Sequence, residues 1–277
     1  EMSHIAKSMS NTETRVELTD SDLMSQVFAI LKNITNVNYT YYKQTTVLRR
    51  IERRIVVTHN RSLQDYVNYL SNNEEEARLL AKEVLIGVTR FFRDPDYFDV
   101  LKDRVIKQIV LNTKPSELIR VWVAGCSTGE EAYSIAILFA EVFEELGEKR
   151  DIKIFATDLD QDSINFASRG VYGDNIIEDI SVARLSRFFT RKGSKYVVNH
   201  EIRRMIIFAQ HNVFQDPPFG KLDLISCRNM LIYFQTILQK NLFSIFHMAL
   251  KDKGYLFLGR SESVSSFDNV FQAFCPN

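Results

Sequence analysis

The sequence predicts an α/β fold, in which a mainly parallel sheet with a small antiparallel insertion follows an all-helical domain. Residues 18–87 repeat apolar residues at helical spacing and contain almost no glycine or proline. From Arg120 onward, short apolar strand patterns alternate with helical patterns, which is typical of a parallel sheet. With 277 residues, 45% of them hydrophobic and 25% charged, the chain is long enough for two globular domains.

Composition narrows the functional classes. The formal net charge of +0 gives no overall attraction to nucleic acid or to membranes. Three widely spaced cysteines (Cys126, Cys227, Cys275) favour neither a disulfide framework nor a metal site, and indicate a reducing cytoplasm. No apolar run reaches the roughly 20 residues that span a bilayer, and no signal peptide is visible. The chain begins at Glu1 with a polar stretch to about residue 17, which indicates a piece of a longer protein.

Residues 18–88 are expected to form the helical domain. Thr19 or Asp20 can cap its first helix. A second helix carries apolar residues on one face, namely Val47, Leu48, Ile51 and Ile55. We expect basic residues on its opposite face and just before it: Lys43, Arg49, Arg50, Arg53 and Arg54. This run is either a solvated face or a docking surface for an acidic partner, such as nucleic acid phosphates or a glutamate-rich helix.

Residues 89–119 are expected to join the two domains. Asp94 precedes Pro95, which favours extended or turn backbone. Residues 100–110 then predict a helix that leads into the first strand.

The stretch from Arg120 to Ser134 organises the second domain, residues 120–277. A strand pattern runs into a turn of small residues (125–129), and Glu130, Glu131 and a helix follow. Small residues let the backbone approach a ligand, but GxGxxG is absent and two acids would repel a pyrophosphate. The pattern therefore favours an adenosine-bearing, positively charged ligand such as S-adenosylmethionine. The alternative is an ordinary tight turn with solvated glutamates.

Polar residues recur where later strands end. Strands are predicted at 153–158, 205–213, 222–229 and 253–259, and the polar residues are Asp158, Asn212, Arg228 and Asn229. Parallel sheets bind ligands at the carboxyl ends of their strands, and an acid after the second strand commonly accepts hydrogen bonds from ribose. Residues 171–204 break the alternation. A Gly-containing turn at 192–194 predicts a hairpin within a small antiparallel insertion.

Two readings of the chemistry start from different residues. Residues 216–219 spell DPPF, which resembles a motif of amine N-methyltransferases, but this motif should follow the fourth strand and here precedes it. Arg93 and Arg228 would instead repel an ammonium and attract a carboxylate. A carboxylate is already an anionic nucleophile at neutral pH, so its methylation needs no general base. Glutamate O-methylation therefore suits the residues better.

Several motifs together resemble the CheR-type chemotaxis receptor glutamate O-methyltransferases. They are TRFFRD (89–94), AGCSTGEEAYS (124–134), ATDLD (156–160), CRNMLIYF (227–234) and GRSES (259–263), in this order. The resemblance implies a Rossmann-like S-adenosylmethionine-dependent domain in a bacterial, cytoplasmic enzyme, which methylates glutamates on chemoreceptor helices and releases S-adenosylhomocysteine. It implies a receptor coiled coil as the partner of the basic helix, a monomer, and no nucleic acid or metal.

The same resemblance assigns roles by motif. Arg93 would face the methionine end of the cofactor, Glu131 its amino group and Asp158 its ribose, and Asn212 would lie by the adenine. Thr89, Gly125, Arg228 and Asn229 would complete the cofactor site. Arg93, Arg228 and Tyr233 would serve catalysis, with Tyr233 positioning the target carboxylate; its alternative is a rim aromatic. Cys126 and Cys227 would be buried bystanders.

Two departures from the family pattern stand out. The turn at 192–194 is short, which predicts direct recognition of the substrate and no tethering of a receptor peptide. The sequence also stops at residues 275–277, where a further strand is expected to begin, which would leave an exposed sheet edge. Two rivals remain: a non-catalytic module that binds S-adenosylmethionine, and a nucleic-acid methyltransferase that uses the basic helix on phosphates.

Overall fold

The computed structural model describes residues 19–85, 87–264 and 270–274, and these form two compact units. Unit 1 comprises the described residues up to Thr40 together with Val47–Ala81. Unit 2 comprises Tyr41–Thr46 and the described residues from Lys82 onward. The polar tail up to residue 17 and the end of the chain at 275–277, on which two expectations rest, lie outside the described residues.

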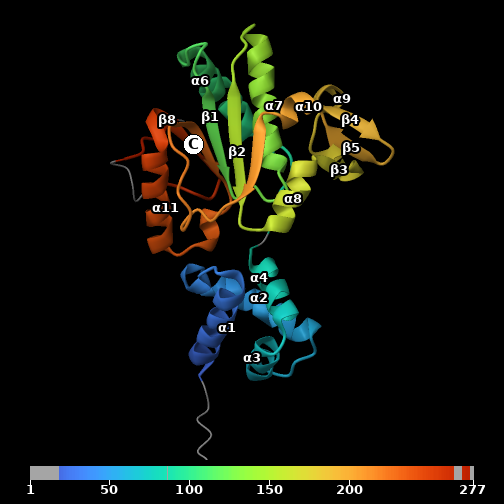
Figure 1. The fold of residues 1–277 in the computed structure, drawn as a ribbon, viewed down its shortest axis with the longest axis vertical. Helices are drawn as coiled ribbons and strands as arrows, with labels where there is room; N and C mark the ends of the chain where they lie inside the picture. Colours follow the sequence, from blue (N-terminus) through green and yellow to red (C-terminus); the bar gives the residue numbers. More distant parts are fainter. Residues whose placement is uncertain (1–18, 86, 265–269, 275–277) are drawn as a thin grey trace, which may run out of the picture. The chain divides into compact units, whose positions relative to one another are not determined.

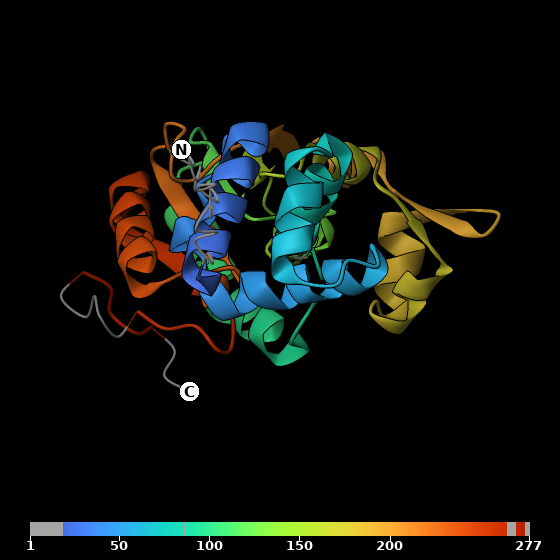
Figure 2. The ribbon, with the colours of Figure 1, turned by 90° about the horizontal axis from the view of Figure 1, so that it is seen from below.

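Unit 1 is built from helices, as predicted. They are α1 (Asp20–Thr35), α3 (Leu63–Ser71) and the greater parts of α2 (Gln44–Val57) and α4 (Glu74–Val84); the first three residues of α2 and the last three of α4 belong to unit 2. Thr19 caps α1 in a reciprocal capping box with Asp22, so the predicted start of this helix is confirmed. Apolar side chains such as Val27, Leu31 and Ile51 are fully buried and form the core. Figure 2 shows α2 running crosswise to α1.

The inner face of α2 differs from the prediction. Positions 47, 51 and 54 follow the helical repeat, so Arg54 lies on the side of Val47 and Ile51, which are fully buried, while Leu48 is 38% exposed. Arg54 donates from Nε to Glu76 Oε1 at 2.8 Å and pairs through Nη2 with Oε2 at 2.5 Å. Glu76 is 4% exposed. Arg54 is therefore an internal ion-pair partner, and its expected place on an exposed basic face is corrected.

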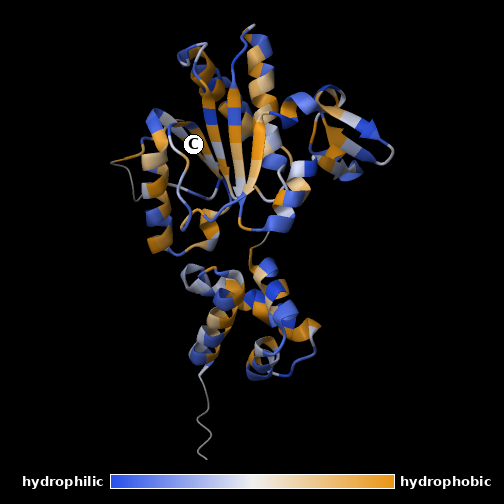
Figure 3. Cartoon of the chain, in the orientation of Figure 1, coloured by the Kyte–Doolittle hydropathy of each residue, from blue (hydrophilic) through white to orange (hydrophobic). Residues whose placement is uncertain are grey.

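Unit 2 contains the central sheet. Its strands are β1 (Ile119–Ala124), β2 (Ile152–Asp158), β6 (Ile206–Gln210), β7 (Leu222–Cys227) and β8 (Leu250–Leu258). The spatial order is β6-β2-β1-β7-β8, and every pairing is parallel, as predicted (Figure 1). The strands are hydrophobic along most of their length (Figure 3), which is typical of a sheet covered on both faces. The chain reverses direction across the sheet beside β1, where such folds bind ligands.

Helices cover this sheet. α7 (Glu130–Glu145) and the continuous helix formed by α5 (Pro95–Val100), a π-helical segment (Leu101–Ile106) and α6 (Lys107–Asn112) share one core with Val121 and Val123 of β1. On the other face Trp122 meets Phe246 of α11 (Thr236–Ala249) edge to face. α8 (Gln161–Arg169) contacts β2 and β6. The alternation of side chains along β1 thus sends neighbouring residues into two cores.

The antiparallel insertion has three strands. They are β3 (Val171–Gly173), β4 (Phe189–Lys192) and β5 (Lys195–Val198), in the order β3-β5-β4. β4 and β5 form the predicted hairpin around Gly193. α9 (Val182–Phe188) and α10 (His200–Arg203) flank the hairpin. The short strand β3 was not predicted, since three residues are too few to show a period. Among the described residues, no helix is both long and apolar enough to cross a membrane.

Candidate functional site

A cavity of about 330 Å³ opens at the carboxyl ends of the central strands, within unit 2. Its walls come from the loops that follow β1, β2, β6 and β7, and from the segment just before α5. Most of the residues predicted to bind cofactor or substrate line it: Thr89, Arg93, Gly125, Glu131, Asp158, Arg228, Asn229 and Tyr233. Parts of the chain that are far apart in sequence therefore meet at one place, as the predicted strand ends require.

The turn after β1 holds Asp158 in place. Ser127 donates its backbone N–H to Asp158 Oδ2 at 2.8 Å, and Asp160 donates to Oδ1 at 3.0 Å. Burial raises the pKa of Asp158, while the N–H donors favour its charged form. Gly125 has a φ of 72°, and a Cβ there would come within 2.8 Å of Met230 Sδ. Only glycine fits this approach between the two loops.

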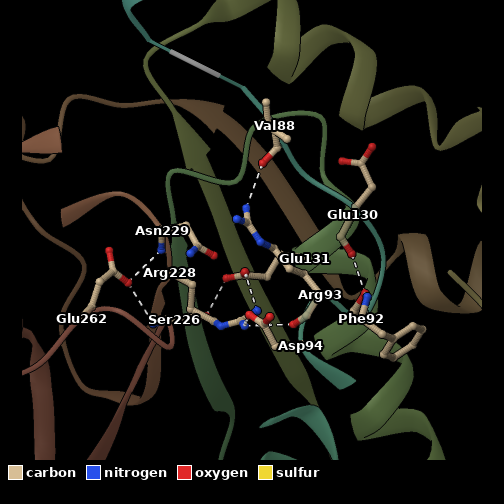
Figure 4. Close-up of polar contacts among 12 residues, drawn as sticks. Val88, Phe92, Arg93, Asp94, Glu130, Glu131, Ser226, Arg228, Asn229 and Glu262 are labelled. Carbon is tan, nitrogen blue, oxygen red and sulfur yellow. Dashed lines mark hydrogen bonds and ion pairs between the residues drawn. The ribbon is translucent and has the colours of Figure 1, made fainter. Parts of the chain in front are cut away.

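Glu131 points into the cavity, and its carboxylate is already oriented (Figure 4). Ser226 donates its hydroxyl to Oε1 at 2.6 Å, and Arg228 Nη1 lies 3.3 Å from Oε2. Burial raises the pKa of Glu131, and the Arg228 charge acts in the opposite direction. Glu130 points to another side, where Thr128 donates to it at 2.7 Å. Glu130 and Glu131 are consecutive residues of a helix and therefore have different surroundings. The prediction that Glu131, and not Glu130, faces the cofactor assumes such a difference.

Arg228 is held by two carboxylates. Its side chain is fully buried, and Nη2 donates to Asp94 Oδ2 at 2.8 Å as well as to the carbonyl of Arg93 at 2.9 Å. The rings of Phe98 and Phe257 lie 5.1 Å and 4.8 Å from its guanidinium carbon. Such rings stabilise a cation that has lost its water. The positive charge of Arg228 is therefore compensated inside the protein, and the expectation that it attracts the substrate carboxylate is corrected.

Arg93 has different surroundings. Its Nη1 donates to the carbonyl of Val88 at 3.1 Å (Figure 4), and among the described residues no carboxylate pairs with it. It is half-buried at the cavity wall, which Tyr233 also lines. Lys43 donates its backbone N–H to the carbonyl of Tyr233 at 2.9 Å. Of the two arginines that line the cavity, Arg93 is therefore the one whose positive charge is not compensated by a described carboxylate and is available to a ligand.

Asn212 is not among the lining residues that the structure describes. Its Oδ1 accepts the N–H of Phe214 at 3.0 Å, and its own N–H donates to Asp216 Oδ2 at 2.7 Å, so its side chain caps a local turn. His211, Val213 and Phe214 line the cavity here. Strand β6 ends two residues before Asn212, which changes the side to which this residue points.

The DPPF segment forms part of this turn and not of the cavity wall. Asp216 accepts the hydrogen bond from Asn212, and Phe219 stacks on Phe155 with ring centroids 4.5 Å apart. Neither residue is among the described cavity-lining residues. The position of the motif therefore gives no support to a role in gripping an amine.

The basic residues predicted on α2 and just before it divide between the two units. Arg49 and Arg53 are exposed and Arg50 is half-buried in unit 1, while Lys43 is exposed in unit 2. In unit 2, Cys126 and Cys227 are buried free thiols whose pKa burial raises well above the usual range. Within the described part of the chain, no group of three or more His, Cys, Asp or Glu side chains could hold a metal ion.

Sequence reasoning missed three polar residues of the site. Asp94 pairs with Arg228, Ser226 donates to Glu131, and Glu262 accepts the N–H of Asn229 at 2.8 Å (Figure 4). Asp94 and Glu262 lie in the motifs TRFFRD and GRSES. These motifs support the family resemblance, but they assign no role to either residue. Ser226 lies inside an apolar strand pattern and gave no signal.

Two family models match consecutive parts of this chain. Residues 22–85 match the family model "CheR methyltransferase, all-alpha domain", and residues 87–275 match "CheR methyltransferase, SAM binding domain". An uncharacterized 104.1 kDa protein of Rhodobacter capsulatus is 42% identical over 254 residues, which make up 92% of this chain. This chain spans only 27% of that protein.

Two relatives of similar length are named as chemotaxis methyltransferases. "Chemotaxis protein methyltransferase 2" of Vibrio cholerae is 32% identical over 86% of this chain and 84% of that protein. "Chemotaxis protein methyltransferase" of Borreliella burgdorferi is 31% identical over 90% of both chains. Together with the two family models, which cover most of the sequence, these relatives fix the assignment. The chain belongs to the CheR methyltransferase family.

Proposed function

We propose that this chain transfers a methyl group from S-adenosylmethionine to glutamate side chains on the signalling helices of chemoreceptors, forming methyl esters. The observation that carries the proposal is Arg93, a cavity-lining arginine with no carboxylate partner among the described residues. A substrate carboxylate would supply that partner, whereas an amine would be repelled. The names of the Vibrio and Borreliella relatives support methylation in chemotaxis.

The cavity residues fit S-adenosylmethionine. Asp158 is fixed by two backbone N–H groups and keeps lone pairs for ribose hydroxyls. Glu131, beside Ser226, keeps acceptor sites for an ammonium group. Val213, Phe214 and Phe234 give the wall an apolar side suited to a purine ring. Acids at both polar positions favour a ligand that carries hydroxyl and ammonium groups over one that carries phosphates.

The protein's own part in the reaction is mainly orientation. When bound, S-adenosylmethionine supplies an electrophilic methyl group on its sulfonium. Arg93 would hold the substrate carboxylate by hydrogen bonds, and Tyr233, which also lines the cavity, would fix its direction. Among the described residues, three carboxylates line the wall, those of Glu131, Asp158 and Asp160. All three accept hydrogen bonds from protein donors, so none is set to remove a proton. A carboxylate nucleophile needs no such base, because it is already ionised at neutral pH.

Basic residues would recruit the substrate. Arg49, Arg50 and Arg53 of unit 1 would attract an acidic helix and raise the rate of encounter, and Lys43 would add a positive charge to unit 2. Arg54 takes no part in this surface, because Glu76 holds it. We expect binding to weaken as salt is added, since exposed charges are screened.

Methyl transfer to receptor fragments tests the proposal. Labelled S-adenosylmethionine is incubated with a helical receptor fragment, and with a matched fragment in which the candidate glutamates are replaced by glutamine. Label in the first fragment and none in the second is the expected result. Label in added DNA or RNA would favour the nucleic-acid rival instead. Tight S-adenosylhomocysteine binding without transfer to any receptor fragment would favour a non-catalytic module.

A further inference from the structure

The carboxylate of Glu262 accepts three backbone N–H groups. Oε2 accepts from Asn229 and from Gly259, both at 2.8 Å, and Oε1 accepts from Leu231, also at 2.8 Å. Figure 4 shows Glu262 beside the loop that follows β7. Hydrogen bonds to an ionised acceptor are among the strongest that a protein makes. One side chain therefore ties the loop after β7 to the end of β8.

The space for this carboxylate is built into the backbone. A Cβ on Gly259 would lie 2.7 Å from Glu262 Oε2 and 3.0 Å from the nitrogen of Asn229. Real Cβ atoms essentially never come as close as 2.7 Å, so a larger residue at 259 would displace the carboxylate. The glycine and the glutamate of the GRSES segment thus form one arrangement.

The loop that Glu262 holds carries much of the cavity wall. Arg228, Asn229, Met230 and Tyr233 all line the cavity. Asn229 has a φ of 59°, a left-handed conformation that asparagine adopts more readily than most residues other than glycine. Its N–H reaches the carboxylate in this conformation. Glu262 therefore supplies the acceptor that this backbone N–H of the loop needs.

We propose that Glu262 is a positioning residue for the cofactor site, which keeps the loop after β7 in its binding shape by accepting the N–H groups of Asn229, Leu231 and Gly259. The inference rests on the proposed function, because it takes the cavity to be the S-adenosylmethionine site. Glutamine cannot replace Glu262. It has a single acceptor oxygen, and its NH₂ group would face at least one of the backbone donors.

Calorimetric titration with S-adenosylhomocysteine tests the inference on the Glu262→Gln variant of the full chain. Glu178→Gln is the matched control, since Glu178 is exposed on the insertion. We expect the Kd to rise about tenfold in Glu262→Gln and to stay unchanged in the control, as one charge-assisted hydrogen bond is lost. Gly259→Ala, which keeps the charge but moves the carboxylate, should give a similar loss and serves if the first variant does not fold.

Amide hydrogen exchange separates positioning from general support. In Glu262→Gln the amides of Asn229, Leu231 and Gly259 should exchange at least about tenfold faster, while those of β7 keep their protection and Tm matches the control. A Kd within twofold of the parent protein in both variants would overturn the inference. So would faster exchange throughout β7 and β8 with a lowered Tm. Failure of the parent protein to bind S-adenosylhomocysteine would instead count against the proposed function.

Discussion

Arg228 and Glu131 form an ion pair inside the protein, with 3.3 Å between Nη1 and Oε2 and no part of the arginine side chain exposed. A buried charge is costly unless its partners compensate it. Asp94 supplies a second carboxylate at 2.8 Å, and the ring of Phe257 lies close to the guanidinium. The pair therefore fixes the direction of Glu131, and in the proposed reaction Arg93 would attract the substrate carboxylate.

Replacing Arg228 by methionine should destabilise the protein by about 3–5 kcal/mol, because Glu131 and Asp94 would lose their buried cation. Urea unfolding measures this change. Arg260→Met is the matched control, since Arg260 is exposed and should change stability by less than about 0.5 kcal/mol. A loss below about 1 kcal/mol in Arg228→Met would show that the pair contributes little to the fold.

Affinity for S-adenosylhomocysteine should fall on acidification. Burial raises the pKa of Asp158 and of Glu131 above their ordinary values of 3.8 and 4.5, so both protonate at a higher pH than exposed acids do. Protonated acids lose acceptor capacity for the ribose and the ammonium, so binding weakens at a pH still above 4.5. Titrations across pH measure this decline. An affinity that stays constant down to pH 4.5 would contradict the raised pKa values.

The same shifts act on stability with the opposite sign. A carboxyl whose pKa is raised by folding favours the folded state most at low pH. Its contribution to the free energy of unfolding is fully present below the ordinary pKa and is lost as pH rises through the raised, folded-state pKa.

The Asp158→Asn variant removes one of the two titrating groups. Its affinity for S-adenosylhomocysteine should be low at every pH and should depend less on pH than that of the parent protein.

Arg53 and Arg54 are neighbours in sequence and should behave oppositely. Arg54→Ala leaves Glu76 buried without its cation and should cost about 3–5 kcal/mol of stability. Arg53→Ala removes an exposed side chain, so stability should change by less than about 0.5 kcal/mol. Receptor-fragment binding should weaken in Arg53→Ala alone at matched folding, and most clearly at low salt. Equal stability losses in the two variants would refute this division.

Arg93→Lys keeps the charge but loses the planar fork that holds a carboxylate by two bonds. We expect kcat/KM for the receptor fragment to fall by about 10–100-fold, in line with a loss of roughly 1.4–2.7 kcal/mol in the transition state. Arg90→Lys is the control, because Arg90 is exposed and does not line the cavity. Steady-state methyl transfer measures both variants. An unchanged kcat/KM in Arg93→Lys would remove Arg93 from the proposed reaction.

Much of the fold could be predicted because it depends on local patterns. The strands, the hairpin around Gly193 and the cap at Thr19 follow from periodicity and from turn or cap chemistry. Asp158 could be placed at the cavity because a buried parallel strand fixes where its end lies. The family motifs, which occur in the expected order along the sequence, indicated which residues share one site.

The remaining features depend on partners that are distant in sequence. The charge of Arg54 favours an exposed face, whereas its helical spacing from Val47 and Ile51 turns it toward Glu76 in the interior. Asn212 lies beyond the end of β6, where the strand no longer fixes its direction. Glu262 meets Asn229 across 33 residues of sequence, and no local pattern announces that contact.

The chemical nature of the transferred methyl group tests the central claim most directly. Receptor fragments labelled by this chain from S-adenosylmethionine are treated with mild alkali, and the volatile label is counted. Esters hydrolyse under these conditions and methylamines do not, so glutamate methylation predicts release of nearly all the label as methanol. Label that stays on the fragment after alkali would contradict carboxylate methylation and, with it, the role given to Arg93.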